Sequence, residues 1–401
     1  MSRLREKIEQ EIRQQGPISF SRYMELCLYD PEFGYYSRNA QQFGKAGDFY
    51  TSSDVHAVFG RLLARQFEEM WRVLGSPNRI TLRELGPGRG LFAQDVLDWS
   101  EKKFPSFFRA LHYQLIERSP ALCQRIEATL SHRFKSGKAS LADGACGSKM
   151  ALPETTGKGT TSVVPNAASG GRALAPEGDV IVFANEFFDA LPIEVISTQG
   201  SLRVDARNGR FLETWAPSSP QELEFLDRYS IHPEPRERVE VPLFAQQYAN
   251  EILATIDRGF FLVIDYGYTR EEQLAGRHRG TLTAIRQHSV SENPYEAPGE
   301  QDITADVNFT ALAAAAEQQS MQTQKIVTQS QFLLGIGEAT EFADAFEDCR
   351  LPQEHAKVAL QLKHLVTPAG MGESFQVLVA SKRVEEEKLK TLSGLNFGRP
   401  I

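Results

Sequence analysis

Residues able to bind a small ligand gather first at a glycine-rich turn. Glu84 precedes Gly86, Gly88 and Gly90, which stand at alternate positions after a short apolar stretch. Such glycines let the backbone turn sharply and approach a ligand, and a helix that starts there supplies free N–H groups. Dinucleotide sites usually have the spacing Gly-x-Gly-x-x-Gly around a pyrophosphate, whereas an acid just ahead of the first glycine suits a cationic ligand. The α-amino group of S-adenosylmethionine is such a cation, so we expect these four residues to bind that cofactor.

A second acid, Glu117, ends the next apolar stretch, Leu115-Ile-Glu-Arg-Ser-Pro120. In dinucleotide folds an acid at this place accepts both ribose hydroxyls, and we expect the same role here. Its distance from Gly90 is longer than usual, which an extended helix would explain. The other interpretation is an acid at a helix N-terminus beside Ser119.

A third group of polar residues, Asn185, Glu186 and Asp189, directly follows an apolar run. In an open parallel sheet the carboxyl ends of the strands line the ligand crevice, so these side chains should converge on the reaction centre. Two carboxylates could hold a guanidinium in bidentate fashion. We therefore expect these three residues to be catalytic. The alternative is a helix-capping Asp189 with a solvated Glu186.

Asp265 and Tyr266 end a further apolar run, ahead of Gly267. Contact with the substrate and a plain turn at the glycine explain this pattern equally well. Two isolated histidines, His56 and His288, are left out of the catalytic set because a lone histidine is more often structural. The sequence suggests no metal site.

Composition limits the classes of function. The chain has 401 residues, a formal net charge of -8 and four scattered cysteines. An acidic chain argues against a general nucleic-acid surface. The cysteine spacing indicates neither a zinc site nor a disulfide framework. With no long apolar stretch and no signal-peptide core, we expect no membrane partner and a cytoplasmic location, since mitochondrial import would need a removed segment not present here.

The candidate residues follow continuous apolar runs that are separated by helical patterns. Such runs indicate a doubly wound α/β fold with a parallel sheet buried on both faces. The expected strands are 80–85, 111–117, 179–184, 260–266, Lys325–Gln329 and Phe375–Ser381, and the expected helices are 4–14, 54–74, 90–104, 119–130 and one between the last two strands. A seventh strand would have to lie within 133–178.

Three segments depart from this alternation. Residues 29–53 are rich in aromatic residues and turn formers, which suits a loop that packs over something. Residues 136–178 are low in complexity and indicate a surface insertion. Asn208-Gly209 lies between alternating runs and predicts a β-hairpin beside the main sheet.

The order of the motifs along the chain adds a resemblance. The sequence resembles the MidA-type methyltransferases, a family that includes a mitochondrial complex I assembly factor that is a protein arginine methyltransferase. The similarity runs from about residue 17 to 380 and is carried by the stretches Pro17–Met24, Asp30–Tyr36, Gly47–Ser52, Phe59–Arg61, Glu84–Gly90, Asn185–Pro192, Asp265–Gly267, Gly299–Phe309 and Met371–Glu373.

The resemblance implies a seven-stranded class I methyltransferase core, S-adenosyl-L-methionine as cofactor and a protein arginine as acceptor. By position it assigns the cofactor to the glycine turn and Glu117, and the reaction to Asn185, Glu186 and Asp189. It also assigns a cofactor-covering loop to Asp48, Tyr50 and Thr51. Two departures stand out: the insertion 136–178 replaces a compact third strand, so no adenine contact is assigned, and Arg118 replaces a smaller residue.

These features predict an order of segments along the chain. We expect an N-terminal helical segment with the covering loop at 1–75, the first part of the core at 76–199, the hairpin insertion at 200–250, the remainder of the core at 251–385 and a tail at 386–401. The oligomeric state is not predicted.

Three functions remain open at this point. The first is a protein arginine methyltransferase that uses Glu186 and Asp189 as a guanidinium clamp. The second is an assembly module that keeps the cofactor fold and chaperones a partner subunit, since a fold does not fix a function. The third is a nucleotide-dependent oxidoreductase, which the glycine spacing disfavours.

Overall fold

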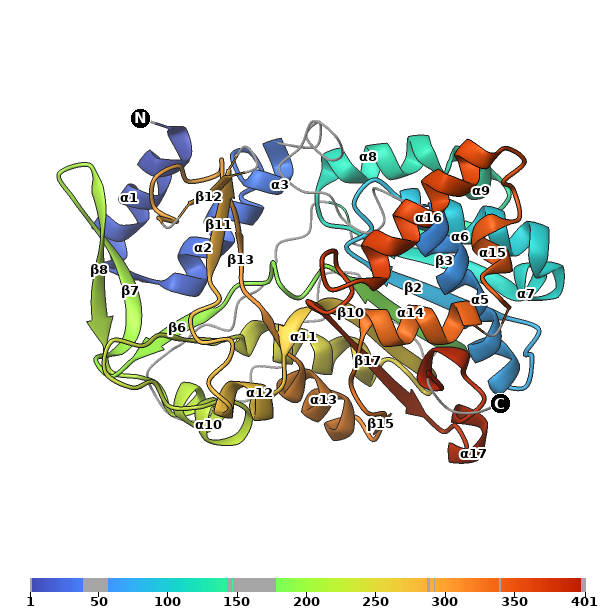
Figure 1. The fold of residues 1–401 in the computed structure, drawn as a ribbon. Coiled ribbons are helices and arrows are strands. Elements are labelled where there is room, and N and C mark those ends of the chain that lie inside the picture. Colours follow the sequence, from blue (N-terminus) through green and yellow to red (C-terminus); the bar gives the residue numbers. More distant parts are fainter. Residues whose placement is uncertain are drawn as a thin grey trace.

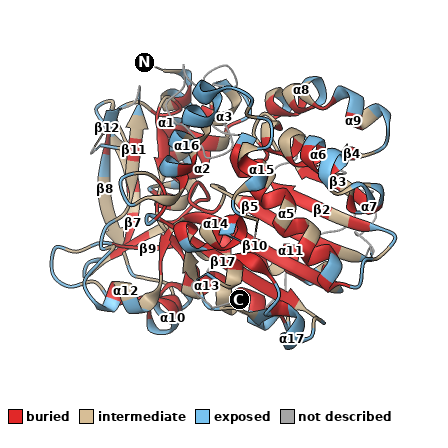
Figure 2. Cartoon of the chain, turned by 45° about the vertical axis from the view of Figure 1, so that its right-hand side comes forward, coloured by how far each residue is buried: buried red, intermediate tan, exposed pale blue. Residues whose placement is uncertain are grey.

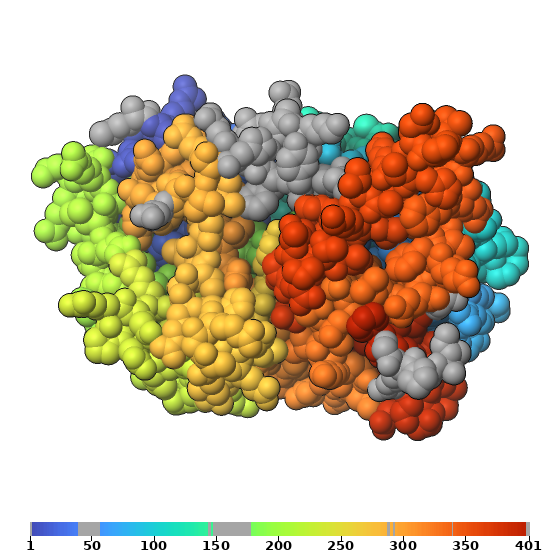
Figure 3. Space-filling model, in the orientation of Figure 1, coloured from blue at the N-terminus to red at the C-terminus, as the bar shows by residue number. Residues whose placement is uncertain are grey.

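The computed structural model describes residues 2–38, 57–142, 146, 178–286, 289–291, 293–338 and 340–397. Figure 1 shows a large α/β body beside a smaller part built from the N-terminal helices and two further sheets. In the space-filling view, residues of about 200–290 lie at the left of the face shown, and α14–α16 lie at the right (Figure 3).

The main sheet has nine strands, and its path runs β15-β17-β10-β5-β2-β3-β4. Strands β2, β3, β4, β5 and β10 are parallel, whereas β17 runs antiparallel to its neighbours. The strands of the path are β2 Ile80–Leu85, β3 Leu111–Ile116, β4 Ala139–Leu141, β5 Asp179–Asn185, β10 Arg258–Tyr268, β15 Gln322–Thr323 and β17 Phe375–Lys382, with β14 Val307–Asn308 and β16 Val327–Thr328 attached to it.

Alternate side chains of the central strands enter different cores. On β5, Ile181 and Phe183 join one cluster, whereas Val180 and Val182 join the other. In Figure 2 the buried residues accordingly concentrate along β2, β5, β10 and β17. Burial on both faces explains the continuous apolar runs in the sequence.

Helices cover both faces. Residues of α5 Ala57–Val73, α6 Leu91–Lys103, α14 Gln329–Glu338 and α16 Pro352–Val366 pack on one face, and those of α11 Leu243–Ala254 and α13 Phe309–Gln318 on the other. The remaining helices of the body and its edges are α7 Pro105–Ala110, α8 Pro120–Thr129, α9 Ser131–Lys135, α12 Arg270–Leu274, α15 Ala343–Phe346, α17 Glu386–Leu389 and the 3-10 turn Ser393–Leu395.

The smaller part contains a five-stranded sheet of β1 Ile18–Ser19, β6 Glu194–Ser197, β7 Gly200–Arg207, β8 Arg210–Ala216 and β9 Val239–Val241. The helix α10 Pro220–Tyr229 lies in the connection between β8 and β9. Arg207 pairs with Arg210, and the two residues between them, Asn208 and Gly209, have φ of 51° and 72°. Two positive φ angles define the tight turn that suits the twist of a hairpin, so the predicted hairpin is confirmed.

A three-stranded sheet completes the smaller part. It consists of β11 Thr283–Arg286, β12 Ser289–Ser291 and β13 Asp302–Thr304. It packs against α1 Arg3–Gln15 and α2 Phe20–Tyr29 through a core that also takes in β6 and β7, and α3 Tyr35–Arg38 follows α2. One of the crossings between the two parts of the molecule follows β5, where residues 186–193 lead from the main sheet to β6.

The α/β class with its largely parallel sheet is as predicted, but three expectations need correction. The expected strand Lys325–Gln329 is wrong in extent, because only Val327–Thr328 pairs there and α14 starts at Gln329. The insertion 136–178 is structured at its start, where β4 pairs with β3; apart from 136–142, Cys146 and Gly178 it lies outside the described residues.

The third correction concerns the cysteines. Cys123 and Cys146 form a disulfide across 23 residues of sequence, with their Cα atoms 6.4 Å apart. The expectation of no disulfide was wrong, because the spacing of the cysteines along the sequence does not show that Cys146, which follows β4, lies next to Cys123 of α8. Within the described ranges, no helix is long and apolar enough to cross a membrane.

Candidate active site

A cavity of about 520 Å³ lies where the carboxyl ends of β2, β3 and β5 face the smaller part of the molecule. Its walls come from the glycine turn, the end of β3, the loop after β5, α2 and β13. Cavities of several hundred Å³ suit small-molecule ligands. The sequence-predicted residues that line it are Glu84, Gly86, Gly88, Glu117, Asn185, Glu186 and Asp189.

The glycine turn owes its shape to three left-handed residues. Gly86, Gly88 and Gly90 have φ of 63°, 54° and 75°. A Cβ on Gly86 would lie 2.7 Å from a ring carbon of Phe187, whereas one on Gly88 would meet nothing within 4 Å. Gly88 therefore leaves open space at the cavity wall. Gly90 is the N-cap of α6, packs near Ile126 and is not among the lining residues, so its contact with a cofactor stays a prediction.

Glu84 is held inside the wall. It is 5% exposed, and its Oε2 atom accepts a hydrogen bond of 2.8 Å from the hydroxyl of Tyr113. Burial raises the pKa of Glu84 to about 8, although the hydrogen bond from Tyr113 acts in the opposite direction and lowers this pKa. A cation in the cavity would favour the charged form, so the site suits a ligand that carries a positive group.

Glu117 directly follows β3, and its side chain is turned back on its own backbone. Oε1 accepts the N–H groups of Arg118 and Ser119, both at 2.8 Å. Burial raises its pKa to about 7. Ser119, whose Oγ accepts the N–H of Leu122, is the cap of α8. The capping role thus belongs to Ser119, and Glu117 is left to line the cavity.

The loop after β5 brings its three polar residues together. Asn185 Nδ2 donates to Glu186 Oε1 at 3.1 Å, and Glu186 has a φ of 49°. A left-handed non-glycine residue costs about 1 kcal/mol or more, and such strain is often found at functional sites. No helix begins at Asp189, so the alternative of a capping aspartate is wrong.

Asp189 carries the strongest electrostatic signal of this loop. It is 9% exposed, lines the cavity and has an Oδ1 atom without a hydrogen-bond partner in the part of the chain that the structure describes. Burial raises its pKa well above the ordinary value, helped by the charges of Asp265, Glu186 and Asp302. An unpartnered buried carboxyl is costly unless a ligand satisfies it.

Asp265 supports this loop from behind and does not line the cavity. Its Oδ2 atom accepts the N–H groups of Phe187 at 3.1 Å and Phe188 at 2.9 Å, and its Oδ1 atom that of Tyr266 at 2.9 Å. The Tyr266 ring lies 3.9 Å from that of Phe375 between centroids. Asp265 is thus a positioning residue, and neither of the two alternatives left open for it describes this role.

The sequence missed three lining residues on the opposite wall, Tyr29, Tyr36 and Asp302. Tyr36 donates to Asp302 Oδ1 at 3.0 Å, and Tyr29 donates to the carbonyl of Ala190 at 2.9 Å. The aromatic segment predicted to pack over something contains both tyrosines. Asp302 lies in one of the stretches that carried the family resemblance, but nothing in its local pattern indicated a ligand.

Some predicted positions cannot be compared. Asp48, Tyr50 and Thr51 of the expected covering loop, and the two isolated histidines His56 and His288, lie outside the described residues. The roles of the first three stay predictions. In the part of the chain that is described, no cluster of three or more His, Cys, Asp or Glu side chains could hold a metal ion.

Comparison with known proteins agrees with this geometry. Residues 62–327 match the model of a family described as "Putative S-adenosyl-L-methionine-dependent methyltransferase". A crystal structure from Burkholderia thailandensis, bound to S-adenosyl-homocysteine, superposes with a TM-score of 0.79 at 26% identity, over 99% of this chain and 94% of that one. The bound molecule in that structure is the cofactor after loss of its methyl group.

Two curated relatives are similar over most of their length. The Drosophila melanogaster protein is 31% identical over 94% of this chain and 84% of its own, and the Homo sapiens protein is 28% identical over 91% and 80%. Both are named mitochondrial protein arginine methyltransferase NDUFAF7, the first as a homolog. For the present chain, the cytoplasmic location stays a prediction.

Proposed function

We propose that this chain, which belongs to the MidA-type family of S-adenosyl-L-methionine-dependent methyltransferases, transfers the methyl group to an arginine side chain of a protein. The observation that carries the acceptor assignment is Asp189, a buried carboxyl at the cavity wall whose Oδ1 atom has no partner among the described residues. The names of the curated relatives supply the same acceptor class.

The cofactor end of the cavity is assigned to Glu84, Glu117, Gly86 and Gly88. Glu84 suits the α-amino group because a cation there offsets the cost of ionising a buried carboxyl. Glu117 suits the ribose hydroxyls, since a carboxylate at the end of the second strand accepts two hydrogen bonds side by side. Gly88 leaves space for the ligand to approach the backbone. We also retain Gly90, Asp48, Tyr50 and Thr51 as proposed cofactor contacts.

The acceptor end is assigned to Asn185, Glu186 and Asp189. A guanidinium is planar, remains charged in water and presents pairs of N–H groups that match carboxylates. Several carboxyls in one buried place repel each other, and a bound cation relieves this repulsion. Asn185 holds Glu186 through its side-chain amide and so fixes the direction in which the carboxylate faces.

In the proposed reaction, an arginine nitrogen forms a bond to the methyl carbon while the bond between that carbon and the sulfonium sulfur breaks. The sulfur takes up the electron pair and leaves as a thioether. The nitrogen loses one proton, which a carboxylate of Glu186 or Asp189 accepts. The protein's part is to hold the two reactants in line and exclude water from them.

The fold supports a finer assignment. We propose that the seven strands of the path from β15 to β4 correspond to the seven-stranded class I core, with β4 as the strand sought within 133–178. The segment boundaries expected from the sequence, 1–75, 76–199, 200–250, 251–385 and 386–401, are kept as proposals. The predicted hairpin itself occupies only β7 and β8.

The test uses purified protein, tritiated S-adenosylmethionine and a peptide array in which each arginine peptide has a lysine counterpart. We expect label on arginine peptides, recovered as methylarginine after hydrolysis. Glu186→Gln should remove transfer while leaving cofactor affinity, measured by calorimetry, within a few-fold. Glu127→Gln removes an equal charge from the exposed face of α8 and should leave both quantities unchanged.

Two outcomes would count against the proposal. Unchanged turnover in Glu186→Gln would exclude the carboxylate clamp. Binding of the cofactor without label on any peptide or on proteins of a cell extract would instead favour the assembly module that keeps the fold without the reaction.

A further inference from the structure

One carboxylate of the cavity comes from a part of the chain far from the loop after β5. Asp302 begins β13 in the three-stranded sheet, is 6% exposed and lines the same cavity as Glu186 and Asp189. Together with Thr304 of the same strand, it forms the wall that faces the catalytic loop from the smaller part of the molecule.

Aromatic side chains hold Asp302 in place. The Tyr36 hydroxyl donates to Asp302 Oδ1 at 3.0 Å, and the rings of Tyr29 and Tyr36 lie 5.4 Å apart between centroids. Tyr29 in turn donates to the carbonyl of Ala190, next to Asp189. The Arg118 guanidinium lies over the Tyr29 ring, 5.5 Å from its centroid, so a flat cation already stacks on the aromatic pair beside this carboxylate.

The backbone fixes this strand against the catalytic loop. The N–H of Ala305 donates to the carbonyl of Asp189 at 3.0 Å. On its other side, Asp302 pairs with Ile285 of β11. The end of β13 is therefore joined to the loop after β5 by a direct hydrogen bond, and the two acids cannot move far apart while it is intact.

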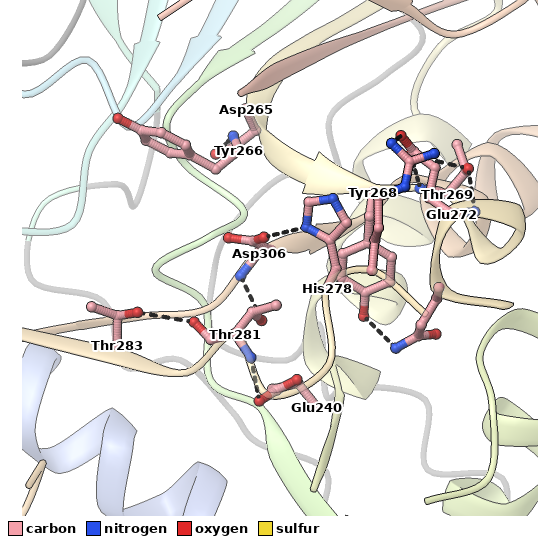
Figure 4. Close-up of polar contacts among 12 residues, drawn as sticks. Glu240, Asp265, Tyr266, Tyr268, Thr269, Glu272, His278, Thr281, Thr283 and Asp306 are labelled. Carbon is pink, nitrogen blue, oxygen red and sulfur yellow. Dashed lines mark hydrogen bonds and ion pairs between the residues drawn. The ribbon is translucent and has the colours of Figure 1, made fainter. Parts of the chain in front are cut away.

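A second set of contacts closes the base of the three-stranded sheet (Figure 4). His278 Nδ1 lies 2.9 Å from Asp306 Oδ2, and the N–H of Asp306 donates to Thr281 Oγ1 at 3.1 Å. Glu240 Oε1 accepts the N–H groups of Thr281 at 3.0 Å and Leu282 at 3.2 Å. These contacts tie the chain before β11 to the chain after β13. Because Thr283 of β11 pairs with Thr304 of β13, they anchor the end of the sheet at which β11 begins and β13 ends.

The electrostatics of the cavity place Asp302 with the catalytic acids. Its charge is one of those that raise the pKa of Asp189. It also raises the pKa of Tyr29 and Tyr36, after burial itself. Asp189 Oδ1, buried and without a partner among the described residues, is an independent sign that this crowded place receives a positively charged ligand.

We propose that Asp302, held by Tyr36, binds the acceptor guanidinium on the side opposite Glu186 and Asp189 and thereby selects arginine over lysine. A guanidinium has five N–H groups spread over a plane and can bond to carboxylates on two edges at once, whereas an ammonium is a compact charge that one wall satisfies. The inference rests on the proposed arginine methylation and adds the residue that sets its specificity.

The experiment compares Asp302→Asn with Glu296→Gln, which removes the same charge from an exposed side chain outside the cavity. The probes are acetyl-glycyl-arginyl-glycine amide and its lysine counterpart, studied by calorimetry in the presence of S-adenosyl-homocysteine and by turnover with S-adenosylmethionine. In Asp302→Asn we expect the KM for the arginine probe to rise roughly 10- to 100-fold with kcat within a few-fold, as for a lost contact made equally in ground and transition state. Affinity for S-adenosyl-homocysteine should stay within about twofold, a range of well under 1 kcal/mol.

The discriminating readout is the ratio of arginine to lysine affinity, which should fall in Asp302→Asn and stay constant in Glu296→Gln. An unchanged ratio and KM in Asp302→Asn would overturn the inference while leaving arginine methylation intact. If the wild-type protein binds the arginine probe without methylating it, the proposed function fails, but the affinity ratio still decides the role of Asp302.

Folding is monitored by the binding of S-adenosyl-homocysteine. If the Asp302→Asn variant does not bind S-adenosyl-homocysteine, the Tyr36→Phe variant is used in its place. This change removes only the hydroxyl that donates to Asp302. A several-fold rise in KM confined to the arginine probe would support the inference. Equal affinity of Tyr36→Phe and wild-type protein for both probes, or no binding of either probe by the wild-type complex, would contradict it.

Discussion

At the scale of single residues, three carboxyls in the cavity wall are kept close to neutral by burial. Glu84, Glu117 and Asp189 each line the wall and have raised pKa values, with burial as the largest cause. Such groups resist ionisation until a cation or a hydrogen-bond donor arrives. The residues that we propose bind the reactants therefore suit positively charged partners, a sulfonium cofactor with an α-amino group at one end and a guanidinium at the other.

A pH dependence follows for Glu84. In the unliganded protein its pKa is about 8, and a bound α-amino cation should lower it, so binding near pH 6.5 releases a proton and affinity for S-adenosyl-homocysteine rises toward pH 8. The proton release is measured as the dependence of the binding enthalpy on the ionisation enthalpy of the buffer. Glu84→Gln should bind at least about tenfold more weakly at pH 8, from the loss of a charge-assisted hydrogen bond.

The same experiment on Glu117→Gln provides the comparison, since Glu117 is assigned to uncharged hydroxyls. A pH profile of Glu84→Gln equal to that of the wild-type protein would exclude Glu84 as the partner of the amino group.

At the scale of elements, the strand ends decide the site. Strands β2, β3 and β5 stop at the same edge of the sheet, and the turn after each one contributes a wall of the cavity. The turns after β2 and β5 also touch each other, because Phe187 packs against Gly86. A change in the glycine turn should therefore affect the loop after β5, which carries the acids that we propose as catalytic.

This contact allows a graded test with three glycines of positive φ. Gly137→Ala, with φ of 71° and open space around it, should cost only the backbone strain of about 1 kcal/mol. Gly88→Ala should cost a similar amount of stability but also weaken cofactor binding, since the new methyl group enters the cavity wall. Gly86→Ala should be the most harmful of the three, because its Cβ would stand 2.7 Å from Phe187 Cδ2.

Chemical denaturation gives the free energy of unfolding of the three variants, and calorimetry gives their affinity for S-adenosyl-homocysteine. If all three variants lost the same amount of unfolding free energy and of affinity, backbone strain alone would explain the effects. The Gly86–Phe187 contact would then have no special role.

At the scale of the whole molecule, buried acids occur in both parts. Glu84 and Asp265 belong to the main sheet, whereas Glu240 anchors the three-stranded sheet from β9. Burial raises the pKa of Glu84 to about 8 and the pKa values of Asp265 and Glu240 to about 7. In an unfolded chain these groups ionise near their ordinary values of 4.5 for glutamate and 3.8 for aspartate.

The sign of the resulting pH effect is fixed. Between about pH 4 and 8 the folded protein binds more protons than the unfolded chain, so its free energy of unfolding falls as pH rises through this range. Each such carboxyl should contribute on the order of 1 kcal/mol or more to the loss. The melting temperature without ligand should therefore be lower at pH 9 than at pH 6.

Two measurements qualify this prediction. Bound S-adenosyl-homocysteine should flatten the pH dependence, because its amino group favours the ionised form of Glu84. Glu240→Gln, which keeps an acceptor for Thr281 and Leu282, should flatten it without affecting ligand affinity. Stability that rises from pH 6 to 9 would contradict the assignment of neutral buried carboxyls.

The sequence by itself determined the central parallel strands and residues on three walls of the cavity. Apolar runs and turn residues predicted β2, β3 and β5 to within one residue and β10 to within two at each end. Glu84, Glu117 and Asp189 were predicted because acids at parallel strand ends must meet at one edge, and all three line the cavity. These inferences depend on local periodicity and on a topology rule, and both are present in the order of residues.

Only the tertiary structure decided what faces those walls. Asp302 lies more than a hundred residues from Asp189, and its approach depends on the packing of the three-stranded sheet against α1 and α2 and on the Ala305–Asp189 hydrogen bond. The supporting role of Asp265 and the Cys123–Cys146 disulfide were hidden for the same reason. Such contacts join segments that are distant in sequence, and no spacing of residue types along the chain specifies them.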